Sequence, residues 1–205
     1  MLHIGIDFDN TLISYDALFF ECALAKKMIP CDFRADRHVL RSTIRQLRDG
    51  ERLWQQLQAE VYGIRIDRAP MMEGASAFLT ACRKKKIKIS VISHKTEFAV
   101  QDKAVNLRAA ALKWMTANGF FEKSGYLISK NDVFFESTRQ DKIRRIDLQG
   151  CTHFIDDLMD VLLDTCFPDR IFKICFCPRR SNHIRKDISC FQSWFEIERY
   201  FQTAE

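Results

Sequence analysis

Short apolar segments rich in β-branched residues recur along the chain and alternate with longer amphipathic segments. Each apolar segment is too short to span a membrane and has the length of a buried strand. Five of them are predicted to be strands: the run from His3 up to Asp7, and residues 87–93, 133–135, 152–157 and 171–176.

The longer segments carry apolar residues at helical spacing, and most of them end at glycine or proline, which favours helices. We predict helices at residues 15–28, 34–48, 51–62, 75–85, 104–118, 139–148 and 191–201. Because strands and helices alternate, the pattern predicts an α/β fold, a mostly parallel sheet flanked by helices with right-handed crossovers. The first three helices have no strand between them, so residues 14–70 are expected to form a helical insertion after the first strand.

The composition is that of a folded globular protein. The chain has 205 residues, of which 47% are hydrophobic and 29% charged,. No apolar stretch is long enough to span a membrane, and the N-terminus lacks a signal-peptide pattern, so we expect a cytoplasmic protein without a membrane partner. The net charge of +5 favours anionic partners but does not by itself indicate nucleic acid,.

The eight cysteines are scattered, without a Cys-x-x-Cys motif or the histidine spacing of a zinc site,. Reduced thiols packed as small buried hydrophobic side chains fit this distribution. Cys175 and Cys177 share a face of a predicted strand, and core packing is favoured there over metal binding. The basic segment 179–186 is expected to be solvated surface, with phosphate contact at the rim of a cleft as the alternative.

Polar side chains stand where three predicted strands end: Asp7 and Asp9, Ser93, and Asp156 and Asp157. Ligands of open parallel sheets bind outside the carboxyl ends of the strands, so these side chains are expected to share a site. Asp7 and Asp9 lie two positions apart and therefore on one side of the strand. Close carboxylates repel unless a cation compensates them, and Mg²⁺ accepts such oxygens. The alternative is that the two aspartates only cap the next segment.

The segment 7–11, Asp-Phe-Asp-Asn-Thr, resembles the Asp-x-Asp-x-Thr signature of the haloacid dehalogenase-like (HAD) phosphohydrolases. The segment 92–94, Ile-Ser-His, is similar to the second motif of that family, and the segment 154–160 is similar to the fourth. The third motif is only a lysine. Lys142, in the helix that leads to the strand before Asp156, is preferred over its rival Lys95.

The resemblance implies a Rossmann-like HAD core at residues 1–13 and 71–205 and a small C1-type helical cap at residues 14–70. It also implies that Asp7 is a nucleophile that forms an aspartyl-phosphate, and that Asp9 is the general acid and base. Lys142 would neutralise charge on the phosphate.

For the cofactor, the resemblance implies Mg²⁺ held by Asp7, the backbone carbonyl of Asp9 and Asp156, with Asp157 or Asp160 as a further ligand. Contacts to substrate are expected from a second set of residues: Asn10, Thr11, Ser93, His94, Lys95 and Arg45.

The acidic residue at position 9 favours phosphate esters, because the dehalogenating relatives lack an acid there. Arg41, Arg45, Arg48 and Arg52 are spaced as one helix stripe, which either binds an anionic part of the substrate or is a solvated basic face.

We therefore predict a Mg²⁺-dependent phosphatase, acting as a monomer or homodimer on a small phosphorylated metabolite such as a sugar phosphate. Nucleotides and nucleic-acid ends are the alternative substrates. The rival classes are a non-catalytic regulatory protein and a nucleic-acid-binding protein, and the scattered acidic residues weigh against the latter.

Overall fold

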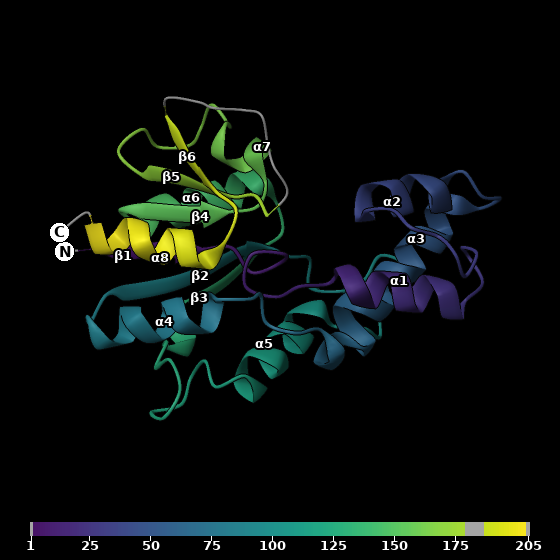
Figure 1. Cartoon of the computed structure of the whole chain (residues 1–205), viewed down its shortest axis with the longest axis horizontal. Helices are drawn as coiled ribbons and strands as arrows, with labels where there is room; N and C mark the ends of the chain where they lie inside the picture. Colours follow the sequence, from purple (N-terminus) through teal and green to yellow (C-terminus); the bar gives the residue numbers. More distant parts are fainter. Residues whose placement is uncertain (1, 179–186, 204–205) are drawn as a thin grey trace. The chain divides into compact units, whose positions relative to one another are not determined.

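A six-stranded sheet forms the centre of the larger of two compact units in the computed structural model, which describes residues 2–178 and 187–203. The strand order is β3-β2-β1-β4-β5-β6, and every neighbouring pair is parallel (Figure 1). This confirms the predicted α/β fold. The strands have these bounds: β1 (His3–Ile6), β2 (Lys88–His94), β3 (Val133–Glu136), β4 (His153–Asp156), β5 (Phe172–Phe176) and β6 (Ile188–Phe191).

The strand β6 was not predicted, because residues 171–176 were expected to form the last strand. It is only four residues long and pairs with β5 alone, at the edge of the sheet. The segment forms a strand only because it pairs with β5, and such a tertiary contact is not visible in the local sequence. The predicted helix at 191–201 is displaced accordingly and lies in α8 (Trp194–Thr203). The predicted surface loop at 179–186 lies outside the described residues.

Helices cover both faces of the sheet. His153 packs against Phe201 of α8, with ring centroids 5.0 Å apart, whereas the next residue, Phe154, packs in a cluster with residues of α6 (Arg139–Leu148) and α7 (Met159–Leu162). Successive strand residues point to opposite faces, so α8 lies on one face and α6 and α7 on the other. The helix α4 (Ala75–Lys84) joins α8, with Phe78 against Trp194 at 5.0 Å.

The second compact unit consists of Ser14–Pro70 and Thr96–Met115. The first segment holds α1 (Asp16–Ala25), α2 (Arg37–Arg45), α3 (Gly50–Ala59), the π-helical turn η1 (Glu60–Ile64) and the 3₁₀ turn η2 (Ile66–Arg68). The second segment contributes most of α5 (Leu107–Ala117). Aromatic packing stabilises the unit: Phe19 stacks on Trp54 at 5.0 Å, and Trp114 Nε1 donates a hydrogen bond to the carbonyl of Ala69,. The assignment of residues 14–70 to a cap stays a prediction.

The expectation that four arginines form one helix stripe is wrong. The helix α2 ends at Arg45, and Asp49 has a left-handed backbone with φ of 57°. A side chain at Gly50 would lie 2.4 Å from the carbonyl oxygen of Arg45, so the chain turns too tightly there for a continuous helix,. Arg48 therefore falls between two helices and Arg52 on the second of them.

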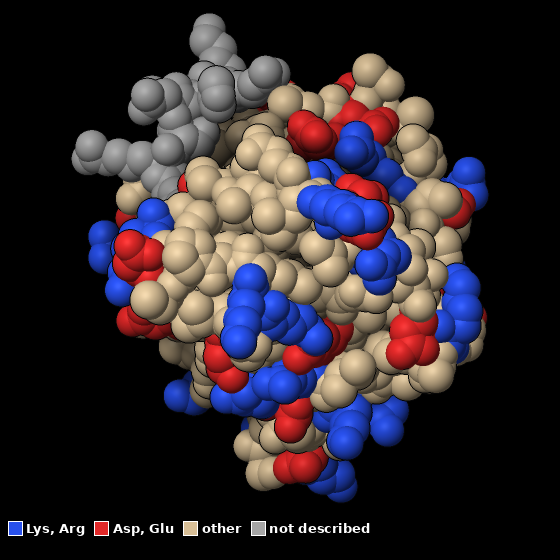
Figure 2. All heavy atoms as spheres, turned by 90° about the vertical axis from the view of Figure 1, so that its right-hand side faces the viewer, with Lys and Arg blue, Asp and Glu red and all other residues tan. Residues whose placement is uncertain are grey.

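The surface shown in Figure 2 carries basic and acidic side chains interspersed, with no single-sign field across it. Ion pairs between oppositely charged side chains include Arg45–Glu51 and Arg65–Glu60. Among the described residues, no helix has the length and apolar composition that crossing a membrane requires.

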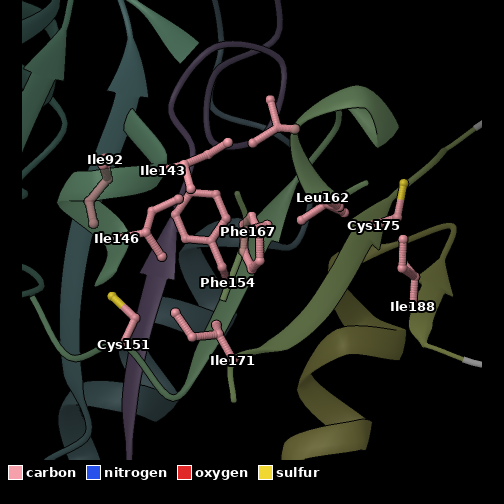
Figure 3. Close-up of a cluster of buried hydrophobic side chains, with 11 residues drawn as sticks. Ile92, Ile143, Ile146, Cys151, Phe154, Leu162, Phe167, Ile171, Cys175 and Ile188 are labelled. Carbon is pink, nitrogen blue, oxygen red and sulfur yellow. The ribbon is translucent and has the colours of Figure 1, made fainter. Parts of the chain in front are cut away.

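A cluster of buried side chains holds α6 and α7 against β4 and β5 (Figure 3). Phe154 of β4 is fully buried among Ile143 and Ile146 of α6 and Leu162 of α7. A side chain at Gly5 would lie 2.6 Å from the Phe154 ring, so this glycine permits the ring to approach β1. Burial of each of these large side chains contributes about 2 kcal/mol, which holds α6 against the sheet,.

Candidate active site

Two buried carboxylates meet where β1 and β4 end. The backbone N–H of Asp7 donates to the carbonyl of Ile155 at 2.9 Å and so extends the ladder of these strands by one residue. Asp156 is the last residue of β4. The exposed fractions are 4% for Asp7 and 0% for Asp156, so both side chains need partners inside the protein,.

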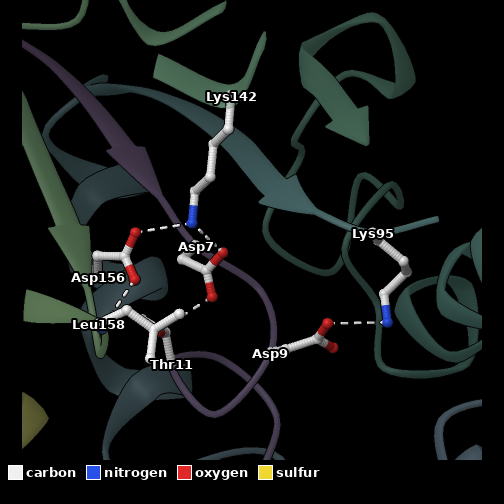
Figure 4. A network of polar contacts seen from close by, with 7 residues as sticks. All are labelled: Asp7, Asp9, Thr11, Lys95, Lys142, Asp156 and Leu158. Carbon is white, nitrogen blue, oxygen red and sulfur yellow. Dashed lines mark hydrogen bonds and ion pairs between the residues drawn. The ribbon is translucent and has the colours of Figure 1, made fainter. Parts of the chain in front are cut away.

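Lys142 supplies that partner from the first turns of α6. Its Nζ lies 2.6 Å from Asp7 Oδ1 and 2.7 Å from Asp156 Oδ2, with the lysine 1% exposed (Figure 4). The helix begins at a cap in which Thr138 Oγ1 accepts from the backbone N–H of Asp141 at 3.0 Å,. This cap and the packing of α6 together hold the ammonium between the two carboxylates.

The pKa values of this group follow from burial and from the like and unlike charges around it. Burial, with Asp156 and Asp9 nearby, raises the pKa of Asp7 to about 7 although Lys142 opposes the shift,. Burial alone would lower the pKa of Lys142, but Asp156 and Asp7 outweigh it and raise that pKa above the usual value. The lysine therefore keeps its positive charge, and Asp7 takes up a proton more readily than an ordinary aspartate.

The backbone after Asp7 turns sharply and presents Thr11. The N–H groups of Leu12 and Ile13 both donate to the carbonyl of Phe8, and Asn10 has a left-handed backbone with φ of 60°. Thr11 Oγ1 lies 3.5 Å from Asp7 Oδ2. The indole N–H of Trp194, on α8, donates to the carbonyl of Thr11 at 2.9 Å, and this bond anchors the loop.

Ser93, one residue before the end of the neighbouring strand β2, has an unusual hydroxyl. It is 1% exposed, and its Oγ has no hydrogen-bond partner among the residues that the structure describes. A buried hydroxyl without a partner costs about 1–3 kcal/mol, so such groups are rare unless a ligand binds them. A phosphoryl oxygen is a suitable acceptor for this donor.

Lys95 pairs with the second aspartate rather than the first. Its Nζ lies 2.9 Å from Asp9 Oδ2 and 5.7 Å from the centre of the Phe8 ring (Figure 4). The side chain is 2% exposed, whereas that of Asp9 is 21% exposed. Of the two rival lysines, Lys95 therefore pairs with Asp9, and Lys142 is the one that contacts Asp7.

The carboxylates can accommodate a divalent cation. Asp7, Asp156 and Asp157 offer oxygens that lie within 4.8 Å of one another. The ammonium of Lys142 contacts two of these three carboxylates, those of Asp7 and Asp156. All their ligand atoms are hard oxygens of the kind that Mg²⁺ accepts. Asp160, the alternative ligand, has a side chain that is 80% exposed and lies 3.9 Å from Arg139. The geometry therefore favours Asp157.

Two further residues expected to contact substrate make hydrogen bonds or ion pairs with other residues. His94 is exposed at the end of β2, where its Nε2 contacts the carbonyl of Ser137 at 3.0 Å. Arg45 belongs to the second unit, where its guanidinium pairs with Glu51 at 2.7 Å. Neither role is tested by these contacts.

Sequence reasoning missed three supports of the site. The backbone N–H of Leu158 donates to Asp156 Oδ1 at 2.9 Å and orients that carboxylate. The Trp194 bond to Thr11 joins residues too far apart for any local pattern to reveal it. The cap at Thr138, by contrast, had a signal: Thr138 with Asp141 three residues later matches the spacing of a capping box,.

Neither the protein-family models nor the curated proteins compared with this sequence match it. Solved structures are similar over nearly whole chains. A haloacid dehalogenase-like family hydrolase from Streptococcus pneumoniae has a TM-score of 0.61 at 12% identity, over 98% of this chain and 99% of its own. The HAD hydrolase YfnB from Bacillus subtilis, bound to magnesium, has a TM-score of 0.61 at 11% identity, over 98% of each chain.

A HAD family hydrolase from Deinococcus radiodurans, with bound phosphate and sodium, has a TM-score of 0.57 at 12% identity, over 98% of this chain and 95% of its own. Likeness at this level of identity establishes the fold. The chain therefore has the fold of the HAD-superfamily hydrolases, with a Rossmann-like α/β sheet, as the sequence motifs predicted.

Proposed function

We propose that this protein is a HAD-type hydrolase that cleaves phosphate monoesters with Asp7 as the nucleophile and a divalent metal ion as cofactor. The observation that carries the proposal is the group of Asp7, Lys142 and Asp156, buried at the carboxyl edge of a parallel sheet. It combines a carboxylate nucleophile with a fixed positive charge where ligands bind in this class of fold.

Asp7, Asp156 and Asp157 are the residues that would hold the metal, together with the backbone carbonyl of Asp9. Mg²⁺ is our choice because these ligands are all oxygens, and the magnesium-bound state of YfnB supports it,. When bound, the ion offsets the excess negative charge of the site and stabilises charge on the phosphoryl oxygens.

In the first half of the reaction, a carboxylate oxygen of Asp7 attacks phosphorus. The bond from phosphorus to the leaving oxygen breaks, and Asp9 gives that oxygen a proton, which releases the alcohol and leaves an aspartyl-phosphate. In the second half, Asp9 takes a proton from water, whose oxygen attacks phosphorus. Inorganic phosphate is then released and Asp7 is restored.

Three further side chains would bind the phosphoryl group. The ammonium of Lys142 neutralises charge that develops on phosphate and on Asp7. The hydroxyl of Ser93 has an unused donor, and Thr11 places its hydroxyl 3.5 Å from Asp7 Oδ2. All three positions are fixed by burial, so little reorganisation is needed when the substrate binds,.

For the substrate, we propose a small organic phosphate, with sugar phosphates or related metabolites first. Nucleoside monophosphates and phosphorylated nucleic-acid ends are the alternatives within the same chemistry. The interspersed charges of the surface in Figure 2 support a small substrate over a long polyanion, which favours a continuous basic track,.

The test is release of inorganic phosphate from a panel of sugar phosphates, nucleotides and 5′-phosphorylated oligonucleotides, with Mg²⁺ and with EDTA. We expect turnover that requires the metal and is abolished in Asp7→Asn. The matched control is Asp160→Asn, which removes an exposed carboxylate near the same edge and should retain activity. Folded, Mg²⁺-bound protein that releases phosphate from no ester would overturn the proposal.

A further inference from the structure

Three cysteines that are separated in the sequence converge on one side of the sheet edge. β5 and β6 are parallel, with Cys175 directly opposite Cys190. Cys177 follows Cys175 by two residues and therefore points to the same side. Its backbone N–H donates to the carbonyl of Phe191 at 2.8 Å, which extends the ladder and fixes its position beyond the end of β5. The pairing of two strands thus builds the cluster.

The geometry of the cluster is close to that of a thiolate metal site. The three Sγ atoms all lie within 4.8 Å of one another. Zinc–sulfur bonds of about 2.3 Å in a tetrahedral arrangement place sulfurs about 3.8 Å apart. Rotation of the half-buried side chains of Cys177 and Cys190 would suffice to close that difference.

We propose that Cys175, Cys177 and Cys190 form a binding site for a thiophilic divalent cation, with Zn²⁺ as the representative ion. Each thiol gives its proton to solvent as its sulfur–metal bond forms. Cys175 is 2% exposed, while the other two cysteines are half-buried. The three sulfurs would hold the ion and leave a further coordination position for water or another ligand.

Binding to this cluster needs deprotonated sulfurs, so it is accompanied by proton release and strengthens as pH rises. Burial, with Cys177, Cys190 and Asp156 nearby, raises the pKa of Cys175, and burial with Cys190 raises that of Cys177,.

The cluster differs from both the candidate active site and the remaining cysteines. Its ligands are soft sulfurs, whereas those of Asp7, Asp156 and Asp157 are hard oxygens. Zn²⁺ therefore prefers the cysteines and Mg²⁺ the carboxylates. Among the described residues, the other five cysteines join no such group. The sequence favoured core packing at Cys175 and Cys177. That interpretation did not include Cys190, which lies beside them only because the unpredicted strand β6 pairs with β5.

The experiment titrates reduced, metal-free protein with Zn²⁺ and, separately, with Cd²⁺ under anaerobic conditions, in excess Mg²⁺. We expect one equivalent to bind with release of protons, and Cd²⁺ to produce the ultraviolet charge-transfer absorption of thiolate ligands. Because the readout reports sulfur–metal bonds, it is independent of phosphate release and of the proposed reaction.

The cluster variants are Cys177→Ser and Cys190→Ser, which change half-buried positions and spare the buried Cys175. We expect each to weaken binding more than about 100-fold, because loss of an outer-shell partner alone costs about 10- to 100-fold. The matched controls are Cys31→Ser and Cys166→Ser, both at exposed positions, which should bind like the unmodified protein. Circular dichroism confirms folding.

An absence of charge-transfer absorption in the reduced protein would overturn the proposal. So would absorption that survives in both cluster variants, or a disulfide within the cluster in protein that binds no metal once reduced.

Discussion

The ammonium of Lys142 and a carboxylate oxygen of Asp7 lie 2.6 Å apart, and both side chains are almost completely removed from solvent. Replacement of the lysine by methionine keeps much of the volume but leaves Asp7 and Asp156 without their cation. We expect Lys142→Met to lower the free energy of unfolding by about 3–5 kcal/mol in metal-free buffer, measured by urea denaturation. The control is Arg144→Met on the same helix, whose exposed ion pair with Asp141 should contribute no more than about 1 kcal/mol,. Equal effects of the two substitutions would contradict this account.

Ser93 and Ser90 lie on one strand and should respond to alanine in opposite ways. Ser93 Oγ is buried without a partner among the described residues, so Ser93→Ala should leave stability unchanged or raise it by about 1 kcal/mol,. Ser90 Oγ lies 2.8 Å from His3 Nε2, so Ser90→Ala should lower stability by about 1 kcal/mol or more,.

Ser93→Ala should be the more stable of the two variants but the less active one. Removal of the Ser93 hydroxyl takes a donor from the phosphoryl group, and we expect kcat/KM to fall by about 10²-fold or more. Ser90→Ala should retain most of its turnover. A stable Ser93→Ala enzyme with unchanged kinetics would remove the serine from the proposed site.

The choice between Asp157 and Asp160 is decided by metal affinity. Asp157→Asn removes a charge that lies within reach of Asp7 and Asp156, and we expect the Mg²⁺ concentration for half-maximal activity to rise about tenfold or more,. Asp160→Asn alters a side chain that is 80% exposed and should leave that concentration unchanged. The reverse ranking would move the metal ligand to Asp160.

His153 should make the protein less stable in acid. Burial lowers its pKa from the usual value of 6.5, and its ring stacks on Phe172 at 4.8 Å. Between the lowered pKa and 6.5 the unfolded chain binds the proton more strongly, so stability falls as pH decreases through that window.

We expect His153→Phe, which keeps an aromatic ring, to reduce this acid dependence. Thermal and urea unfolding should be measured at pH 7.5 and pH 5. The free energy of unfolding of the variant should rise relative to that of the unmodified protein at the lower pH, by up to about 1.4 kcal/mol per pH unit within the window. The difference between the two proteins would be independent of pH if His153 kept its ordinary titration in the folded state.

Local patterns predicted those parts of the fold that local physics determines. The helix Arg139–Leu148 has the bounds predicted for it, because its apolar spacing and the glycine shortly after it are local signals. The grouping of polar side chains at the strand ends was also predicted, because parallel strands bring their carboxyl ends to one edge of the sheet. These two results place Asp7, Lys142 and Asp156 together, as the structure does.

The features that sequence reasoning missed depend on contacts between distant residues. The strand β6 exists by pairing with β5, a strand that precedes it by more than ten residues. The pairing of Lys95 with Asp9 follows from where β2 ends relative to the loop after β1, which residue spacing does not encode. Each needs the tertiary arrangement before it can be inferred.

The hydrogen bond from Trp194 to the carbonyl of Thr11 has a consequence for biosynthesis. The donor follows its acceptor by 183 residues, so the loop that carries the aspartates emerges from the ribosome long before its anchor is made. At a synthesis rate of about 5–20 residues per second, that interval lasts roughly 10–40 seconds. A nascent chain therefore exposes its acidic loop unanchored throughout that interval, and the site is assembled only when α8 docks.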